Sequence, residues 1–203
     1  MIAIVDYKMG NLASVKNAFS LLGEEIVLES DPDKLGQYDK LILPGVGAYG
    51  DAMEHLKERG MDEAVKAYSK SGNYMLGICL GMQLLFDSSE EFGFNEGLGL
   101  IPGKIISFDT SKFSHPLKVP HMGWNRMFTS DHALFKGMDK EHYLYFVHSF
   151  HAVCENKENS IGECEYGYKF SACVQKDNIL GIQPHPEKSH KNGLAILKNF
   201  ISL

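Results

Sequence analysis

The sequence predicts an α/β fold with a doubly wound, mostly parallel central sheet, helices on both faces and an antiparallel extension in the second half. Through the first half, short apolar runs alternate with segments of helical periodicity, which is the order of βαβ units. From residue 93 to about residue 175 the pattern changes to short strands and turn signals. In such a sheet, functional side chains are expected at the carboxyl ends of the strands.

The first half begins with a buried strand at residues 1–6. Apolar residues then recur at helical spacing from Leu12 to Leu22, and Gly23 ends that helix. The same reasoning predicts strands near residues 25–28, 40–43 and 74–78, and helices around residues 53–59 and 61–69.

The second half ends with a hairpin and a helix. Asp177-Asn178 is a hairpin signal, and the apolar run that follows it, residues 179–183, predicts another buried strand. The last helix, at residues 193–200, places four apolar side chains toward the core: Leu194, Ile196, Leu197 and Phe200. No linker or repeat interrupts the pattern, so we expect residues 1–203 to form one domain.

The composition is that of an ordinary globular protein. The 203 residues, 44% hydrophobic and 11% aromatic, suffice for a sizeable core. A net charge of −6 without a basic run argues against nucleic acid as the main partner. We recognise neither a signal peptide nor an apolar run that could cross a membrane, and we expect a cytoplasmic protein.

Cysteine spacing does not indicate a metal site. The cysteines at positions 79, 154, 164 and 173 form no Cys-x-x-Cys pair, so a zinc site is not expected despite nine histidines. We interpret Cys154, Cys164 and Cys173 as reduced core thiols. No metal and no cofactor are predicted.

Residues 77–81, Gly-Ile-Cys-Leu-Gly, are the most informative segment. They follow the apolar run 74–76 and precede a helix-like run at residues 82–86. A nucleophile between glycines at a strand-to-helix turn is a nucleophile elbow, here with Cys79 in place of serine. The positive end of the following helix favours the reactive thiolate. A small buried thiol is the alternative, because free cysteine packs as a hydrophobe.

A second segment, Pro184 to Lys188, follows the strand at residues 179–183. Prolines on both sides of His185 hold the chain extended or turning. In extended chain the side chains of His185 and Glu187 point the same way, so Glu187 can orient His185 as the base for Cys79. Alone, this segment reads as a polar surface loop; together with the elbow it predicts a nucleophile–base–orienter triad.

At these residues the chain resembles the class I glutamine amidotransferases, and most closely their HisH subfamily, the glutaminase subunits of imidazole glycerol phosphate synthase. Three further stretches match that subfamily: residues 4–12, 120–125 and 145–150. The resemblance covers essentially the whole chain. Lys8, Phe150 and Pro184 depart from the usual pattern, and the last two leave details of the glutamine pocket open.

The resemblance implies glutamine hydrolysis by Cys79, His185 and Glu187 through a thioester, in a site whose oxyanion hole has two donors. The Leu80 N–H, directly after the nucleophile, is the natural first donor. The segment Pro44–Gly47 follows the strand at residues 40–43 and so lies at the same sheet edge. Without the resemblance, a plain strand-to-loop turn is an equally good interpretation of this segment. The resemblance implies that Val46 or Gly47 supplies the second N–H.

Glutamine-binding residues are expected around the elbow. Gln83 stands one helical turn after Cys79, facing the same side, with a solvated helix residue as the alternative. Glu91 is a candidate for the substrate ammonium, although a charged surface loop looks the same. The remaining candidates follow the family's pocket segments: Gly45, His148, Ser149 and Phe150.

The resemblance also implies a heterodimer with a HisF-type (β/α) barrel cyclase, which uses the ammonia to make imidazole glycerol phosphate and an aminoimidazole carboxamide ribonucleotide in histidine biosynthesis. The expected interface residues are Asn11, Trp124, Tyr145 and Lys188. Tryptophan is enriched at interfaces, but a buried core tryptophan is the competing interpretation of Trp124.

Three other functions are alternatives at this level, and the first of them stays open. A HisH/HisF-like pair can instead feed ammonia to amidination of a bacterial surface sugar. An inactive amidotransferase-like scaffold is disfavoured by the intact triad. A cysteine hydrolase acting on another amide does not fit the stretches near Asp6, Trp124 and Tyr145.

Overall fold

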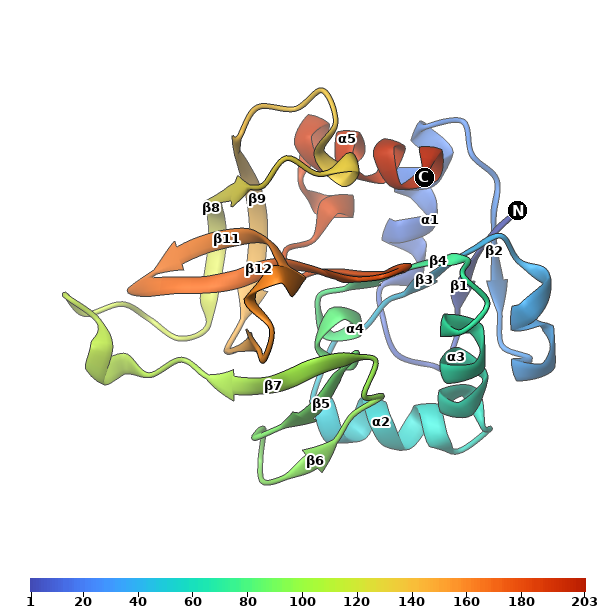
Figure 1. The fold of residues 1–203 in the computed structure, drawn as a ribbon, viewed down its shortest axis with the longest axis horizontal. Helices are drawn as coiled ribbons and strands as arrows, with labels where there is room; N and C mark the ends of the chain where they lie inside the picture. Colours follow the sequence, from blue (N-terminus) through green and yellow to red (C-terminus); the bar gives the residue numbers. More distant parts are fainter.

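The computed structural model describes residues 1–203 and joins thirteen strands in one sheet (Figure 1). Its central part is parallel and has the order β2-β1-β3-β4-β13. These strands span Ile26–Glu29 (β2), Ile2–Val5 (β1), Lys40–Leu43 (β3), Tyr74–Ile78 (β4) and Ile179–Ile182 (β13). Their carboxyl ends meet at one edge, where ligands bind in doubly wound sheets. The predicted fold class is confirmed.

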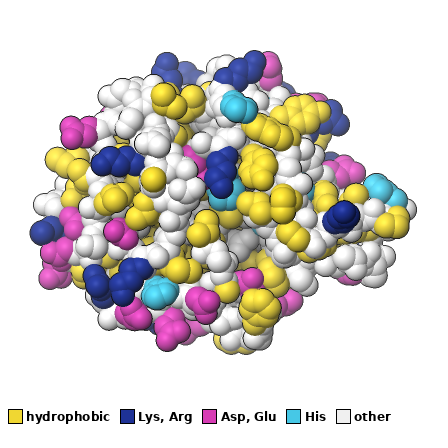
Figure 2. All heavy atoms as spheres, turned by 180° about the vertical axis from the view of Figure 1, so that it is seen from behind, with side chains coloured by type: hydrophobic (Ala, Val, Ile, Leu, Met, Phe, Trp, Pro, Cys, Tyr) yellow, Lys and Arg dark blue, Asp and Glu magenta, His cyan; other side chains and the backbone are white.

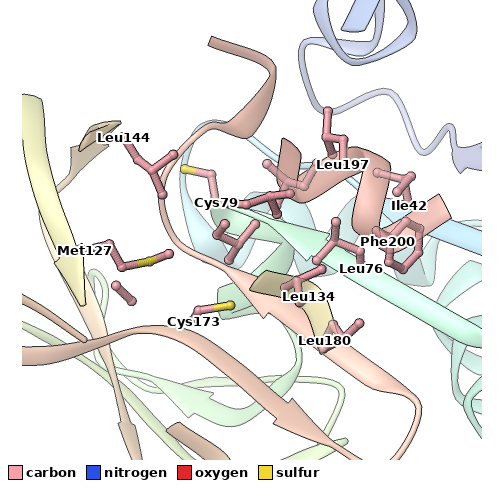
Figure 3. Close-up of a cluster of buried hydrophobic side chains, with 14 of the residues drawn as sticks. Ile42, Leu76, Cys79, Met127, Leu134, Leu144, Cys173, Leu180, Leu197 and Phe200 are labelled. Carbon is pink, nitrogen blue, oxygen red and sulfur yellow. The ribbon is translucent and has the colours of Figure 1, made fainter. Parts of the chain in front are cut away.

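Helices cover both faces of this parallel part (Figure 1). One face carries α1 (Leu12–Leu21) and α5 (His190–Ser202), and the other carries α2 (Tyr49–Lys57) and α3 (Met61–Ser69). Each face has its own buried apolar cluster. Figure 3 shows Leu197 and Phe200 of α5 in the first cluster, together with Leu76 and Cys79 of the elbow region. The predicted packing of the last helix onto the core is confirmed.

The second half extends the sheet with mainly antiparallel strands. From β13 the order continues β12-β10-β7-β5-β6, and β11, β8 and β9 branch from β12; only the β5–β7 pair is parallel. The bounds are β5 Phe86–Ser89, β6 Asn95–Glu96, β7 Ile101–Ser107, β8 His121–Thr129, β9 Glu141–His148, β10 Phe150–Cys154, β11 Ser160–Tyr166 and β12 Tyr168–Lys176. The hairpin predicted at Asp177-Asn178 joins β12 to β13.

Short 3-10 helices complete the chain. They are η1 (Pro32–Gln37), η2 (Thr110–Lys112), η3 (Ala133–Phe135), η4 (Lys157–Asn159) and η5 (Pro186–Lys188). The last of these begins one residue after His185 and carries Glu187 of the predicted triad.

The prediction of a helix at residues 82–86 is wrong in its extent. The structure has only α4, Leu80–Gln83, and Phe86 already begins β5, because β5 is recruited by pairing with β6 and β7. A helix of one turn has only a small dipole, so α4 contributes its free N–H groups to the site rather than a strong field.

The helix expected around residues 53–59 begins earlier, at Tyr49. Its N-terminal residue Ala48 offers no side-chain cap, and the Tyr49 N–H instead donates to the Glu91 carboxylate at 2.6 Å. A cap that is 42 residues away in sequence leaves no local signal for the start of the helix.

The elbow glycines are required by close packing of backbone. A Cβ on Gly81 would overlap the carbonyl oxygen of Leu43 at the end of β3, and a Cβ on Gly77 would lie 2.6 Å from the carbonyl oxygen of Gly81. Neither position can accept a side chain without moving a strand end. The glycines therefore fix the distance between β3, β4 and α4, in addition to permitting the turn.

We expect Gly81→Ala to lower the free energy of unfolding by about 3 kcal/mol or more, because its methyl group meets backbone that cannot rotate away. Urea unfolding followed by circular dichroism measures the change. Gly36→Ala is the matched control, since a Cβ there has no neighbour within 4 Å, and it should shift stability by at most about 1 kcal/mol. Equal, small effects at both positions would contradict the packing argument.

Candidate active site

A pocket of about 310 Å³ opens at the carboxyl ends of β3 and β4. It brings together most residues that the sequence predicted for the site, and Gly45 and Glu187 are the two that do not line it. Pro120 and Val147 line the pocket but were not predicted, although each lies inside a stretch that carried the family resemblance. The lining residues are Val46, Gly47, Cys79, Leu80, Gln83, Glu91, Pro120, Val147, His148, Ser149, Phe150 and His185.

Cys79 sits on a strained backbone at the tip of the elbow. Its φ of 55° and ψ of −113° are unusual for a residue with a side chain, and such strain persists only where the surroundings enforce it. The thiol is 7% exposed and borders the pocket. Its sulfur lies 4.0 Å from the carbonyl oxygen of Val147 and 3.8 Å from Nε2 of Gln183.

His185 is hydrogen-bonded to Glu187. The two side chains are 3% and 2% exposed, and Nδ1 of His185 lies 2.8 Å from Oε1 of Glu187. The expected extended conformation is wrong for this pair: Pro186 opens the η5 turn, a position that proline favours, and the turn brings Glu187 back to the ring. Nε2 has no partner with full hydrogen-bond geometry within the protein.

The environment of His185 favours its protonated form. Burial lowers the pKa of the ring, but the interactions with Cys79 and Glu187, including the negative charge that both can carry, outweigh burial and raise the pKa to about 10. An imidazolium beside a sulfur stabilises negative charge on that sulfur. The pair can therefore present a thiolate together with a proton donor.

Ser189 holds His185 against β9. Its hydroxyl donates to the carbonyl oxygen of His185 at 2.6 Å and accepts the Tyr145 N–H at 2.9 Å. The His185 N–H in turn donates to the carbonyl oxygen of Tyr145 at 2.9 Å. Ser189 is 1% exposed. Sequence reasoning missed it, and the only signal was a serine placed to hydrogen-bond backbone after a turn.

The segment Pro44–Gly47 lies against the elbow. A Cβ on Gly45 would lie 2.8 Å from the Gly81 nitrogen and 2.9 Å from the Leu80 Cβ, so Gly45 serves close packing rather than lining the pocket. Val46 and Gly47 border the pocket, Gly47 with φ 98°. The Leu80 N–H is the first of α4 and has no acceptor within that helix. Backbone from two strand ends thus lines the pocket together with Cys79.

Three of the predicted glutamine-binding residues have protein partners already. Gln83 is 6% exposed, so the solvated alternative is wrong; its Nε2 donates to the Phe150 carbonyl at 3.1 Å and to Oε1 of Gln183 at 2.9 Å. Glu91 accepts the Tyr49 N–H through one carboxylate oxygen. The third residue, His148, belongs to a chain of buried histidines.

The histidine chain has a defined direction. His148 Nδ1 donates to the Phe150 carbonyl at 2.7 Å, so its Nε2 must accept from Nδ1 of His121 at 2.9 Å. His121 Nε2 then accepts from the Asn125 amide at 3.2 Å. Burial lowers the pKa of His148 to about 3 and that of His121 to about 4. Both rings are therefore neutral at pH 7, and His148 lines the pocket as a neutral side chain rather than as an acid or a base.

The residues predicted to face a partner lie on the surface. Trp124 is 47% exposed, so the core alternative is wrong; it pairs with Tyr145 across β8 and β9, and its ring stacks on His190 with centroids 5.1 Å apart. Lys188 is exposed on η5. Asn11 caps α1, accepting the Ser14 N–H at 3.3 Å, and α1 packs against η5.

Exposed apolar side chains continue beyond Trp124. Figure 2 shows hydrophobic side chains on one face of the molecule interspersed with acidic and basic ones. The exposed large residues on β8 and β9 are Met122, Trp124 and Tyr143.

Two features of the whole chain bear on other kinds of function. Histidine, cysteine and carboxylate side chains nowhere gather in groups of three or more that could hold a metal ion. None of the helices combines the length and the hydrophobicity needed to cross a membrane.

Comparisons with known proteins agree with this site. The family model "Glutamine amidotransferase class-I" matches residues 3–203. The chain is similar to the imidazole glycerol phosphate synthase subunit HisH of Sulfurimonas denitrificans, with 69% identity over 98% of this chain and 97% of that protein. It is similar to HisH of Wolinella succinogenes, with 54% identity over the full length of both. Among solved structures, PurLQS from Thermotoga maritima matches with a TM-score of 0.78 and 21% identity over 99% of this chain and 97% of that one, which supports the fold.

The raised pKa of His185 predicts an unusual titration. The folded value, about 10, exceeds the ordinary 6.5, so the protonated ring stabilises the fold fully below pH 6.5, progressively less as the pH rises, and not at all above about pH 10. In NMR spectra, the His185 ring resonance should titrate near pH 10, and Glu187→Gln should lower that midpoint. His148 is the internal control and should not titrate above pH 5. A His185 midpoint near 6.5 would contradict the proposed pairing.

Proposed function

The chain belongs to the class-I glutamine amidotransferase family, and we propose that Cys79, His185 and Glu187 are the triad with which it hydrolyses glutamine. The observation that carries this assignment is the elbow thiol in the pocket beside a buried histidine that is hydrogen-bonded to a buried carboxylate. The arrangement is that of a nucleophile, its base and the group that orients the base. We further propose that residues 1–203 act as one amidotransferase domain.

The chain is the glutaminase subunit of an imidazole glycerol phosphate synthase, in histidine biosynthesis. This follows from identities of 69%, 54% and 49% to HisH subunits over nearly the whole chain. The same relatives favour the histidine pathway over amidination of a surface sugar. Because HisH is named as a subunit, we propose that the ammonia passes to a HisF-type (β/α) barrel cyclase bound to this chain.

The reaction proceeds in two steps at Cys79. The thiolate attacks the side-chain carboxamide carbon of glutamine, and His185 transfers its proton to the departing nitrogen, which leaves as ammonia. A thioester between Cys79 and the glutamyl group remains. His185, now neutral, removes a proton from water, and the resulting hydroxide attacks the thioester to give glutamate and the free thiolate. Glu187 keeps the ring oriented and stabilises its charge.

Charge on the carbonyl oxygen develops next to backbone donors. The Leu80 N–H is one donor, and the N–H of Val46 or Gly47 is the second. Each such donor contributes roughly 2.7–4 kcal/mol to the transition state in acyl-transfer enzymes. The glycines of the Pro44–Gly47 segment allow a peptide there to take either of two orientations.

The rest of the pocket suits the ends of a glutamine molecule. One carboxylate oxygen of Glu91 accepts the Tyr49 N–H, and the other is available to accept from the substrate ammonium. Ser149 and Phe150 add backbone and side-chain atoms along the wall. The proposed surface for the cyclase consists of Asn11, Trp124, Tyr145 and Lys188.

Cys79→Ala should abolish glutamine-dependent synthesis by the complex and leave ammonium-dependent synthesis intact, because only the first needs the nucleophile. Product formation with each nitrogen source measures both. Cys154→Ala is the matched control, a partly buried thiol outside the pocket, and should keep both activities. A glutamine-like chloroketone should label Cys79 alone, as seen by mass spectrometry. Normal glutamine turnover in Cys79→Ala would exclude it as nucleophile.

We expect the free chain to be a poor glutaminase that the cyclase and its substrate activate. If the peptide in the Pro44–Gly47 segment takes its inactive orientation, the oxyanion hole loses one N–H donor. That loss raises the activation free energy by about 3 kcal/mol, or lowers the rate on the order of a hundredfold. A bound partner restores that donor only by its differential affinity for the active orientation. Turnover by the free chain, by the complex, and by the complex with cyclase substrate measures the effect. Full activity of the free chain would refute it.

Gly47→Ala should reduce this stimulation without preventing complex formation, because its φ of 98° disfavours any side chain and restricts the peptide. Gly60→Ala is the control for positive φ alone: Gly60 has φ 71° and no neighbour within 4 Å, and it lies outside the pocket. Stimulation that is unchanged in Gly47→Ala would place the switch elsewhere.

A further inference from the structure

Gln183 is a fully buried polar side chain that the reaction described above does not use. It directly follows β13, is 0% exposed, and its N–H continues the sheet by donating to the Ala172 carbonyl at 2.8 Å. Burying a carboxamide is unfavourable unless its hydrogen bonds are made. Both of its polar groups have partners, and both partners belong to the active site: Gln83 at 2.9 Å and the sulfur of Cys79 at 3.8 Å.

The orientation of the two amides follows from one backbone carbonyl. The Phe150 oxygen can only accept, so the Gln83 atom 3.1 Å from it is the nitrogen. That nitrogen also donates to Gln183, which must therefore present its oxygen to Gln83. The Gln183 nitrogen is then the atom near Cys79. No other assignment satisfies all three contacts.

The contact of the Gln183 N–H with the Cys79 sulfur favours the charged form of that sulfur. A thiol sulfur is a weak acceptor, whereas a charged acceptor forms a markedly stronger hydrogen bond. An N–H held near Cys79 therefore stabilises the thiolate more than the thiol. Gln183 and His185 flank Pro184, whose ring fixes the backbone between them, so both side chains approach Cys79 from one rigid segment.

The contact with Gln83 fixes which end of the Gln83 amide is free to bind a ligand. Both N–H bonds of Gln83 are committed, one to Phe150 and one to Gln183. Only its oxygen is left for the pocket that it lines, and an oxygen accepts from N–H groups of a substrate.

We propose that Gln183 is a positioning residue of the glutaminase, donating to the sulfur of Cys79 and fixing Gln83 so that Gln83 presents its oxygen to glutamine. The proposal rests on the assignment of Cys79 as nucleophile. It gives one buried side chain two tasks, and each makes a separate prediction.

Several titratable groups surround Cys79 and contribute to its behaviour in any pH experiment. His185 comes from the segment after β13 and Tyr7 from the end of β1, where burial and the nearby Cys79 raise the pKa of the phenol. His148 and Glu91 line the same pocket. None of these groups is changed by substitution at Gln183, so their contributions are common to the variants compared.

The test replaces Gln183 by methionine, which keeps its length and removes its hydrogen bonds. The rate at which iodoacetamide alkylates Cys79, followed by mass spectrometry without glutamine, reports the thiolate as a function of pH. In Gln183→Met we expect the rate at pH 7 to fall about tenfold, which corresponds to about 1.4 kcal/mol, and the inflection to move to higher pH. Gln175→Met, on the preceding strand and outside the pocket, should match the unsubstituted protein.

Glutamine turnover by the complex with the cyclase separates the two tasks. Loss of the donor to Cys79 lowers kcat, and loss of the Gln83 orientation raises KM. An unchanged alkylation profile together with an unchanged KM in folded Gln183→Met would overturn the proposal and leave Gln183 as packing. Because alkylation is measured without substrate, it stays informative even if the protein failed to hydrolyse glutamine, which is the outcome that would reject the proposed function.

A second measurement needs no substitution at Gln183 that could prevent folding. In protein labelled with ¹⁵N at glutamine side chains, the Gln183 carboxamide resonances should shift with the same midpoint as Cys79 alkylation, and the shift should vanish in Cys79→Ala. The Gln175 resonances serve as the reference. Gln183 resonances that do not respond to ionisation of Cys79 would overturn the contact.

Discussion

The active site depends on a contact between backbones, where the end of β3 meets the elbow after β4. Gly81 lies on the Leu43 carbonyl, and Gly45 lies on the amide of Gly81. This contact places the thiol of Cys79, the Leu80 N–H and the Val46–Gly47 peptide around one pocket. Backbone has no rotamers, so the relative positions of the two strand ends are set by the fold itself, and with them the position of Cys79 and of the Leu80 N–H.

The histidine side of the site is held by a different part of the sheet. His185 hydrogen-bonds β9 through its own N–H and through Ser189, and both contacts are made with Tyr145. Tyr145 is also the cross-strand neighbour of Trp124 on the exposed surface. The strand that positions His185, the proposed base, is therefore one of the two strands that form the proposed cyclase surface.

The sequence was most informative where local patterns decide structure. The parallel strands were predicted within one or two residues, and the elbow was found because its cysteine and glycines are neighbours in sequence. The His185–Glu187 pair was also found, but the η5 turn, and not an extended chain, brings its two side chains together. The early start of α2 at Tyr49 was missed because its cap, Glu91, comes from a distant loop. The short α4 was missed because Phe86 pairs with β7, which helical periodicity cannot reveal. Ser189 and Gln183 were missed because a buried serine or glutamine has no signature until its partners are known.

The cap supplied by Glu91 has a consequence for how the pocket receives its substrate. The Glu91 carboxylate holds the first N–H of α2, so the loop after β5 is tied to the opposite side of the site by a contact within the protein. The conformational entropy lost in ordering that loop is thus a cost of folding and not of binding. In the proposed role of Glu91, glutamine meets an anion that the fold has fixed in place, and its affinity is not reduced by having to order that loop.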